Sequence, residues 1–356
     1  MTKLENAMQL AQANLGRSVV RINATAQQEQ LQKQKEYSIF GVKNTEDIPD
    51  SLINKLRQNE HFLFLTIDKM ADLGRSVDID LVNPLTYRCM TGSTSGGCVN
   101  ILKGITDLCI GTDGGGSVLA PALSTNLYSF MGKGIGLMLK KDSLSTDGLP
   151  FAPGVGVIST RLNPIRKAIQ ALTGRAFTKT NESIRIMTPA SGCMMLPTGE
   201  DAHTVLQPIL SQLPKQFIIQ EHTFADCYNR AALVEEINRL IAADVADLFL
   251  TLEGPIDVYS YDETIPKKFE GPLPETLCAN ASKSFVKAAN ICGCSGFTIP
   301  HSRLATGFVV TCPCGWEKAD MGYTLACELE KLVSLPAIFE KYFINREKSV
   351  TPSRFK

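Results

Sequence analysis

Two clusters of glycine and hydroxyl residues lie close together in the first half of the sequence. The first occupies residues 92–97 (GSTSGG), and the second occupies residues 111–117 (GTDGGGS). Three successive glycines let backbone N–H groups converge without obstruction by side chains. Such a concave loop binds an anion, either a phosphate or the oxyanion that forms during acyl transfer. The pattern therefore predicts an anion-binding loop that ends in Ser117.

Phosphate-binding motifs fit this spacing poorly. A P-loop has lysine directly before its final Ser or Thr, and this sequence has Gly116 there. No G-x-G-x-x-G dinucleotide fingerprint lies between an expected strand and helix. A G-x-S-x-G elbow is also absent and the four histidines are scattered, which disfavours a Ser-His-Asp triad. Acyl transfer by a serine, or a purely structural glycine turn, are the remaining interpretations.

The two clusters together resemble the amidase signature, which runs GGSSGG…GTDxGGS in a family of serine amide hydrolases. The match continues into Pro121-Ala122 and includes Arg88 upstream. Weaker similarity, in segments such as FLFLTIDKMADLG and ADVADLFLTLEGP, extends over residues 20–335. The stretch 88–122 is the most specific part. The resemblance implies amide hydrolysis through an acyl-enzyme, with no metal ion or organic cofactor.

The resemblance also implies a role for each matching residue. Ser117 would be the nucleophile that attacks the amide carbonyl. Ser93, after a cis peptide bond to Gly92, would relay a proton between Ser117 and a buried neutral lysine. The oxyanion would be held by backbone N–H groups of three glycines, Gly114, Gly115 and Gly116.

A neutral lysine base requires burial, because burial lowers the pKa from its ordinary value of about 10.4. Lys43, in YSIFGVKNTEDI, resembles the lysine of the family's GIPVAVKDNI strand. The alternative for Lys43 is a surface lysine on an edge strand. A register shift of one residue would make Thr94 the relay in place of Ser93, so Thr94 is also a candidate binding residue.

Two departures from the family pattern bear on activity. The family commonly has arginine two residues after the nucleophile, where this sequence has Leu119. The segment that usually follows the lysine, and much of the segment that shapes the substrate pocket, are missing. An amidase-like scaffold or binding protein, and a glutamine amidotransferase subunit that needs a partner, are therefore alternatives to a hydrolase. The substrate itself is not predicted.

Alternating strands and helices predict an α/β fold with a central mixed sheet flanked by helices. We expect a single domain over 1–356, with an N-terminal helical segment (1–36), a signature half (37–175) and a second half that closes the sheet (176–356). The expected strands include 37–42, 61–67, 154–160, 248–252, 296–300 and 306–312. The expected helices include 48–59, 163–172, 225–243 and 276–290.

Composition limits the expected partners. The 356 residues are 44% hydrophobic and carry 36 basic and 36 acidic side chains, so the formal net charge is zero. That balance predicts neither nucleic-acid nor membrane binding. The start does not resemble a signal peptide, and we expect a cytoplasmic protein whose eleven cysteines, including the pairs 292/294 and 312/314, are reduced thiols rather than zinc ligands. The expected partners are a small amide substrate and either a second copy of the chain or a partner subunit.

Overall fold

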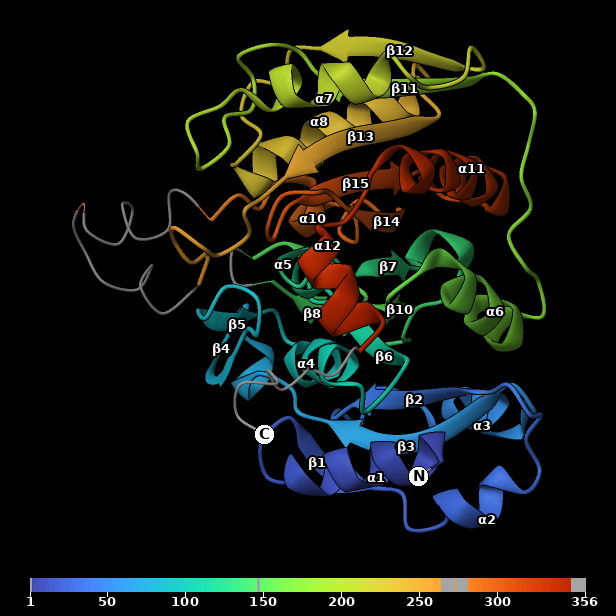
Figure 1. The fold of residues 1–356 in the computed structure, drawn as a ribbon. Coiled ribbons are helices and arrows are strands. Elements are labelled where there is room, and N and C mark those ends of the chain that lie inside the picture. The colour runs from blue at the N-terminus through green and yellow to red at the C-terminus, as the bar shows by residue number, and fades with distance from the viewer. Residues whose placement is uncertain (1, 146–147, 264–271, 273–280, 347–356) are drawn as a thin grey trace.

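A single mixed β-sheet runs through the computed structural model, which describes residues 2–145, 148–263, 272 and 281–346. In these residues the sheet has eleven strands in the order β1-β3-β2-β6-β10-β7-β14-β15-β13-β11-β12 (Figure 1). The pairs β2/β3, β2/β6, β11/β12 and β11/β13 are parallel, and the other neighbours are antiparallel. The prediction of an α/β fold with a central mixed sheet is confirmed.

The first half of the chain contributes one side of the sheet. Its strands in the sheet are β1 (Val19–Ile22), β2 (Ser38–Lys43), β3 (Phe62–Asp68), β6 (Leu108–Asp113), β7 (Tyr128–Met131) and β10 (Gly154–Ser159). Two ribbons of two strands each lie outside the sheet: β4 (Val77–Val82) pairs with β5 (Cys89–Thr91), and β8 (Ser143–Leu144) pairs with β9 (Pro150–Phe151). Its helices are α1 (Lys3–Ala13), α2 (Ala26–Gln30), α3 (Asp50–Gln58), η1 (Asp72–Gly74), α4 (Ser95–Lys103), α5 (Leu119–Ser124), η2 (Lys133–Ile135) and α6 (Leu162–Thr173).

The second half extends the same sheet. Its strands are β11 (Ile184–Pro189), β12 (Phe217–His222), β13 (Leu248–Glu253), β14 (Ser295–Pro300) and β15 (Gly307–Cys312). Its helices are α7 (Ala202–Leu210), α8 (Arg230–Ala242), α10 (Phe285–Ala288), α11 (Trp316–Leu332), α12 (Ala337–Phe339) and η4 (Glu340–Ile344). The halves join where β7 pairs with β14, and there Phe130 lies opposite Phe297 with ring centroids 4.5 Å apart.

Helices cover both faces of the sheet because its strands are apolar on both sides. Successive residues of a strand point to opposite faces. In β6, Leu108 and Ile110 pack into the core that includes α3 and α6, whereas Cys109 packs with Val99 and Ile101 of α4 on the other face. Strands buried on both faces read as continuous apolar runs, which is why β3, β13, β14 and β15 fall where the sequence predicts them.

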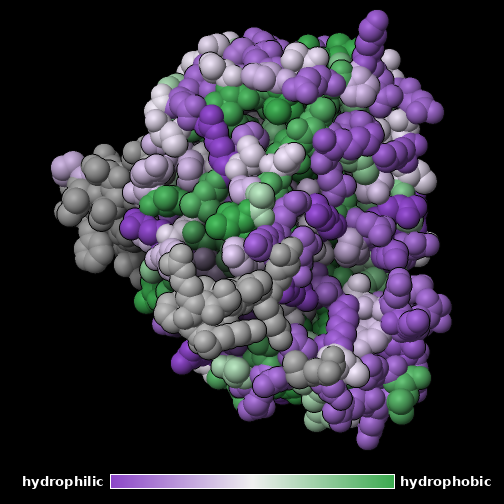
Figure 2. Space-filling model, in the orientation of Figure 1, coloured by the Kyte–Doolittle hydropathy of each residue, from purple (hydrophilic) through white to green (hydrophobic). Residues whose placement is uncertain are grey.

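Hydrophilic residues cover the outer surfaces of the flanking helices. On the face shown in Figure 2, they dominate the right-hand side, over the region where Figure 1 places α3, α6 and α11. This distribution fits helices that turn an apolar stripe to the sheet. In the described part of the chain, every helix is too short or too polar to cross a membrane.

Three predicted helices differ from the structure. The N-terminal segment 1–36 is not helical throughout, because α1 ends before Gly16 (φ 77°) and the next residues pair with β3 as β1. The helix expected over 225–243 begins at Arg230, since the Asn229 side chain caps it by accepting from the Ala232 N–H. Of the helix expected over 276–290, residues 276–280 lie outside the described residues, and the described part is helical only over Phe285–Ala288.

Truncating a side chain in β6 tests the buried sheet. Leu108 is fully buried, so Leu108→Ala is expected to lower the free energy of unfolding by about 2–5 kcal/mol. Leu31→Ala is the matched control, because Leu31 is 87% exposed and its truncation should change stability by less than about 0.5 kcal/mol. Urea unfolding of both variants measures the difference. Equal stabilities would contradict the two-sided burial of β6.

Candidate active site

Two parallel strands bring the candidate lysine to the second glycine cluster. Strand β2 ends at Lys43 and pairs in parallel with β6, with Val42 opposite Ile110. Because parallel neighbours end at the same edge of a sheet, Lys43 lies beside the loop that follows β6. Strand β2 is also flanked by β3 on its other side, and Lys43 is only 4% exposed. Its alternative interpretation as a surface lysine on an edge strand is therefore wrong.

The Lys43 amine is held by hydroxyl and carbonyl oxygens. Its Nζ lies 2.6 Å from Ser93 Oγ, 2.9 Å from Thr112 Oγ1 and 3.2 Å from the Thr112 carbonyl oxygen. Burial lowers the pKa of Lys43 to about 8, although the nearby Asp113 carboxylate acts in the opposite direction. The neutral amine that a base requires is therefore accessible near physiological pH.

Ser93 lies in a tight turn between β5 and α4. Gly92 adopts a left-handed φ of 69°, its N–H donates to the Ser76 carbonyl oxygen at 2.6 Å, and a Cβ there would lie 2.6 Å from the Pro121 ring. The expectation of a cis Gly92–Ser93 bond is wrong: the cis peptide bond among the described residues is Gly254–Pro255. The turn at Gly92 directs Ser93 Oγ to Lys43 with a trans peptide bond instead.

A buried carboxylate shapes the loop that carries Ser117. Asp113 Oδ1 accepts from the Gly116 N–H at 2.7 Å, and Oδ2 accepts from the N–H groups of Val118 (2.7 Å) and Leu119 (3.2 Å). Burial raises the pKa of Asp113, and these three donors act against that rise. The carboxylate thus fixes the backbone on both sides of Ser117.

This arrangement changes the set of N–H groups that could hold an oxyanion. Because the Gly116 N–H already donates to Asp113, it is not available for a substrate oxygen. The N–H groups of Gly114, Gly115 and Ser117 donate to no acceptor among the described residues. The candidate donors for an oxyanion are therefore the N–H groups of Gly114, Gly115 and Ser117, and the predicted Gly116 N–H is not one of them. The sequence alone does not show which backbone donors an aspartate engages.

Ser117 lines a cavity together with Lys43 and Ser93. The cavity has a volume of about 1050 Å³, and the three glycines before Ser117 also line it. Ser117 is half-buried, and its hydroxyl has no hydrogen bond to a described residue. Its carbonyl oxygen accepts from the Thr94 N–H at 3.3 Å, which places the Ser93–Thr94 backbone beside it. The structure therefore gathers Ser117, Ser93 and Lys43 at one cavity.

Thr94 lies behind the wall of this cavity rather than in it. Its side chain is fully buried, and a Cβ at Gly111 would lie 2.6 Å from Thr94 Oγ1. Thr94 is not among the residues that line the cavity, whereas Ser93 is. The packing shows why residue 111 is glycine, since α4 could not approach β6 so closely over a larger residue.

Leu119 occupies the position where the family commonly has arginine. The side chain is fully buried in the main core, and a Cβ at Gly296 would lie 3.0 Å from Leu119 Cδ1. Three backbone N–H groups, including that of Leu119 itself, solvate the buried Asp113 carboxylate. The departure at Leu119 therefore leaves the loop around Ser117 intact.

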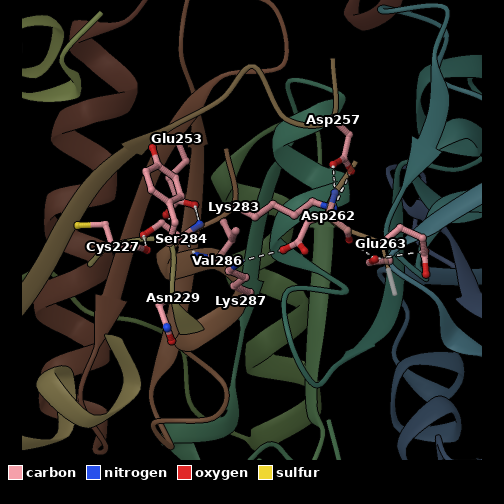
Figure 3. A network of polar contacts seen from close by, with 12 residues as sticks. Cys227, Asn229, Glu253, Asp257, Asp262, Glu263, Lys283, Ser284, Val286 and Lys287 are labelled. Carbon is pink, nitrogen blue, oxygen red and sulfur yellow. Dashed lines mark hydrogen bonds and ion pairs between the residues drawn. The ribbon is translucent and has the colours of Figure 1, made fainter. Parts of the chain in front are cut away.

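A second wall of the cavity comes from the other half of the chain. Buried Glu253, at the end of β13, accepts from the Ser284 N–H at 2.7 Å and the Val286 N–H at 3.3 Å (Figure 3). The Val286 carbonyl oxygen in turn lies against Gly116, where a Cβ would approach it to 2.9 Å. Burial raises the pKa of Glu253 to about 7. This carboxylate positions the segment 283–287 next to the candidate nucleophile.

The sequence alone does not identify the cationic residues of that wall. They are Arg230, Lys283 and Lys287, and across the cavity Arg75 adds a fourth cation. Lysines four residues apart in ASKSFVKAAN were the available signal, but nothing in one sequence places them against residues 114–117. In the described residues, no group of three or more His, Cys, Asp or Glu side chains is placed to hold a metal ion.

Comparison with solved structures shows which fold this is. The sequence matches no family model and no curated protein. The structure is similar to an amidase (TM-score 0.66, 15% identity, 94% of this chain and 97% of the other) and to a 6-aminohexanoate cyclic dimer hydrolase in complex with substrate (0.65, 13%, 95% and 96%). It is also similar to a glutamyl-tRNA(Gln) amidotransferase subunit from Thermotoga maritima (0.62, 14%, 93% and 92%). The predicted resemblance to the amidase signature enzymes is confirmed at the level of the fold.

Replacing the buried lysine tests its environment. Burial lowers the pKa of Lys43 from 10.5 to about 8, so the unfolded chain binds this proton more tightly than the folded protein does. The buried charge therefore destabilises the folded state fully below pH 8, and this effect disappears above about pH 10.5. Removing the buried charge would raise the free energy of unfolding by roughly 3 kcal/mol, and losing the hydrogen bonds of Lys43 would lower it by about 1 kcal/mol. Lys43→Met is therefore expected to raise the free energy of unfolding at pH 7 by about 2 kcal/mol.

Urea unfolding at pH 7 and at the highest pH that the protein tolerates measures this effect. Exposed Lys215 provides the matched control, because Lys215→Met should change stability by less than about 0.5 kcal/mol. A Lys43→Met variant clearly less stable than wild type at pH 7 would show that the amine is well solvated or ion-paired.

Proposed function

We propose that this protein hydrolyses an amide bond, with Ser117 as nucleophile, Ser93 as proton relay and Lys43 as base. The observation that carries the proposal is the 2.6 Å contact between Lys43 Nζ and Ser93 Oγ, both buried, in the cavity that Ser117 lines. A lysine that burial holds close to neutrality, next to a hydroxyl, is the pairing that general base catalysis requires.

The proposed reaction has two halves with the same proton path. Ser117 Oγ attacks the amide carbonyl carbon while its proton passes to Ser93 Oγ and the Ser93 proton passes to neutral Lys43. The carbonyl oxygen becomes an oxyanion, which the N–H groups of Gly114, Gly115 and Ser117 would bind. Collapse of the tetrahedral intermediate breaks the C–N bond, and the leaving amine takes the proton back from Lys43 through Ser93. Water then attacks the acyl-enzyme by the same path and releases the acid.

The fold supports this proposal over a histidine-based mechanism. The similar structures include an amidase, which by its name acts on amides, and a 6-aminohexanoate cyclic dimer hydrolase. The four histidines do not line the cavity. The alternative of an inactive scaffold rests on Leu119 and on the missing segment after Lys43, and the backbone hydrogen bonds of Asp113 weaken the first of these two arguments.

Labelling by a fluorophosphonate tests whether Ser117 is activated. Intact-mass spectrometry is expected to show one covalent adduct on wild type and none on Ser117→Ala, because the probe captures a serine with a base and an oxyanion site. Ser191→Ala is the control, since exposed Ser191 lies outside the cavity lining, and this variant should label fully. An adduct that persists in Ser117→Ala, or an unlabelled wild type, would contradict the proposed nucleophile.

The pKa of Lys43 predicts the pH dependence of hydrolysis. Because the base form of Lys43 grows as pH rises through about 8, kcat/KM should increase about tenfold per unit below pH 8 and level off above it. Lys43→Arg is expected to lose roughly 10²–10⁴ in kcat/KM, since a guanidinium does not become neutral. Ammonia release measured from pH 6 to 9.5 tests both statements. A rate independent of pH across this range would contradict the role of Lys43.

A further inference from the structure

Asn290 is a buried side chain that ties the second half of the chain to the loop of the candidate nucleophile. It lies in the turn between α10 and β14 and is fully buried. Its Nδ2 donates to the Gly114 carbonyl oxygen at 3.0 Å and to the Ala152 carbonyl oxygen at 3.3 Å. Its Oδ1 accepts from the Gly154 N–H at 2.9 Å. These partners fix the orientation of the amide group, because carbonyl oxygens only accept and an N–H only donates.

The three hydrogen bonds hold the ends of two neighbouring strands. Strand β6 ends at Asp113, directly before Gly114, and Asp113 pairs with Gly154 at the start of β10. The fit around the Asn290 amide is close, since a Cβ at Gly154 would lie 3.0 Å from Asn290 Oδ1. Asn290 is not among the residues that line the cavity, whereas Gly114 and Gly115 are. The Gly114 carbonyl oxygen is therefore bound from behind the cavity wall.

The direction of the Gly114 carbonyl determines the direction of the Gly115 N–H. The peptide bond between these glycines is trans, because the cis peptide bond among the described residues is Gly254–Pro255. In a planar trans peptide the C=O and N–H bonds point in opposite directions. A carbonyl bound behind the wall thus turns the Gly115 N–H toward the cavity, where it donates to no acceptor among the described residues. The hydrogen bond to the carbonyl also polarises the peptide group and strengthens its N–H as a donor.

We propose that Asn290 is a positioning residue for the oxyanion site, because it holds the Gly114–Gly115 peptide with its N–H directed at the oxyanion. Asn290 touches no reacting atom and acts only through this peptide group. Without the Nδ2 donor, a peptide between two glycines has wide conformational freedom, and part of the oxyanion stabilisation is lost. The inference rests on the proposed function, since the oxyanion belongs to the same reaction.

The rate of fluorophosphonate labelling tests this role, because the tetrahedral adduct places a phosphonyl oxygen in the oxyanion site. Asn290→Ala is expected to lower the second-order rate constant about 10- to 100-fold, a part of the roughly 10²–10³ that removal of one oxyanion donor costs. The pH dependence of the rate should keep its midpoint near 8, because Asn290 contacts neither Lys43 nor Ser93. A lower plateau with the same midpoint separates a misplaced peptide from a damaged base.

Asn290→Asp is the second variant. Aspartate has nearly the shape of asparagine and still accepts from the Gly154 N–H, but its carboxylate has no donor for the Gly114 carbonyl oxygen. One variant leaves a space and the other introduces a charge, so the two disturb the protein in different ways. A rate loss that both share therefore identifies the missing Nδ2 donor.

Asn83→Ala is the matched control. The Asn83 side chain is also buried, donates to the Ser124 carbonyl oxygen at 2.7 Å and accepts from the Leu85 N–H at 2.9 Å. It lies outside the cavity lining. Its replacement removes comparable buried hydrogen bonds, and the labelling rate should stay close to that of wild type.

Nuclear magnetic resonance observes the Gly114–Gly115 peptide without any reaction. Gly–Gly bonds occur three times in the sequence, at 96–97, 114–115 and 115–116. Cell-free protein made with glycine that carries ¹³C at its carbonyl and ¹⁵N at its amide therefore gives three carbonyl–amide cross-peaks. Asn290→Ala should move the 114–115 peak to lower ¹³C frequency, because the carbonyl loses a hydrogen bond. The 96–97 peak should stay in place, and Asn83→Ala should move none of the three.

Each combination of results decides between the two proposals. A labelling rate that both Asn290 variants leave unchanged, or an unmoved 114–115 peak, would overturn the inference and leave the proposed function standing if wild type labels. A wild type that does not label, together with a 114–115 peak that moves in Asn290→Ala, would support the role of Asn290 in holding the peptide and contradict the proposed function.

Discussion

The burial of one amine between two parallel strands constrains the rest of the site. Lys43 is enclosed by the sheet, and an ammonium group there would be costly without a counter-ion in contact. The structure surrounds it instead with Ser93 Oγ and two oxygens of Thr112, which hydrogen-bond an amine without bringing a full negative charge to it. This environment requires the turn at Gly92 and the close approach of α4 to β6 over Gly111, so one glycine of each cluster follows from the same constraint.

The two halves of the chain supply different walls of the cavity. The first half supplies Lys43, Ser93 and the loop that Asp113 fixes, all tied to strands β2 and β6. The second half supplies the facing wall, where Glu253 holds the segment 283–287 through its backbone N–H groups. Each carboxylate accepts from a loop backbone instead of pairing with an arginine. Loop position is therefore set by short backbone hydrogen bonds rather than by the cations that line the cavity.

The sequence predicted the features that depend on local pattern. Continuous apolar runs located β3, β13 and β15, and the spacing of the glycine clusters selected Ser93 and Ser117. The trans bond before Ser93 and the engagement of the Gly116 N–H by Asp113 depend on exact backbone geometry, which composition does not encode. Arg230 and Lys283 reach the site from more distant parts of the chain, so one sequence does not reveal their place. Leu119 is a departure from the family pattern in the sequence, and its packing in the main core is visible only in the structure.

The two buried lysines of the cavity differ in the chemistry of the groups that they contact. Lys43 and Lys283 are equally enclosed, at 4% exposure each. Lys43 contacts hydroxyl and carbonyl oxygens, and burial lowers its pKa to about 8, as a base requires. Lys283 contacts the Asp257 carboxylate. The hydroxyl of Thr91, the residue before Gly92, donates to the same carboxylate. A carboxylate beside one lysine and hydroxyls around the other thus place the same side chain in two different electrostatic environments at one cavity.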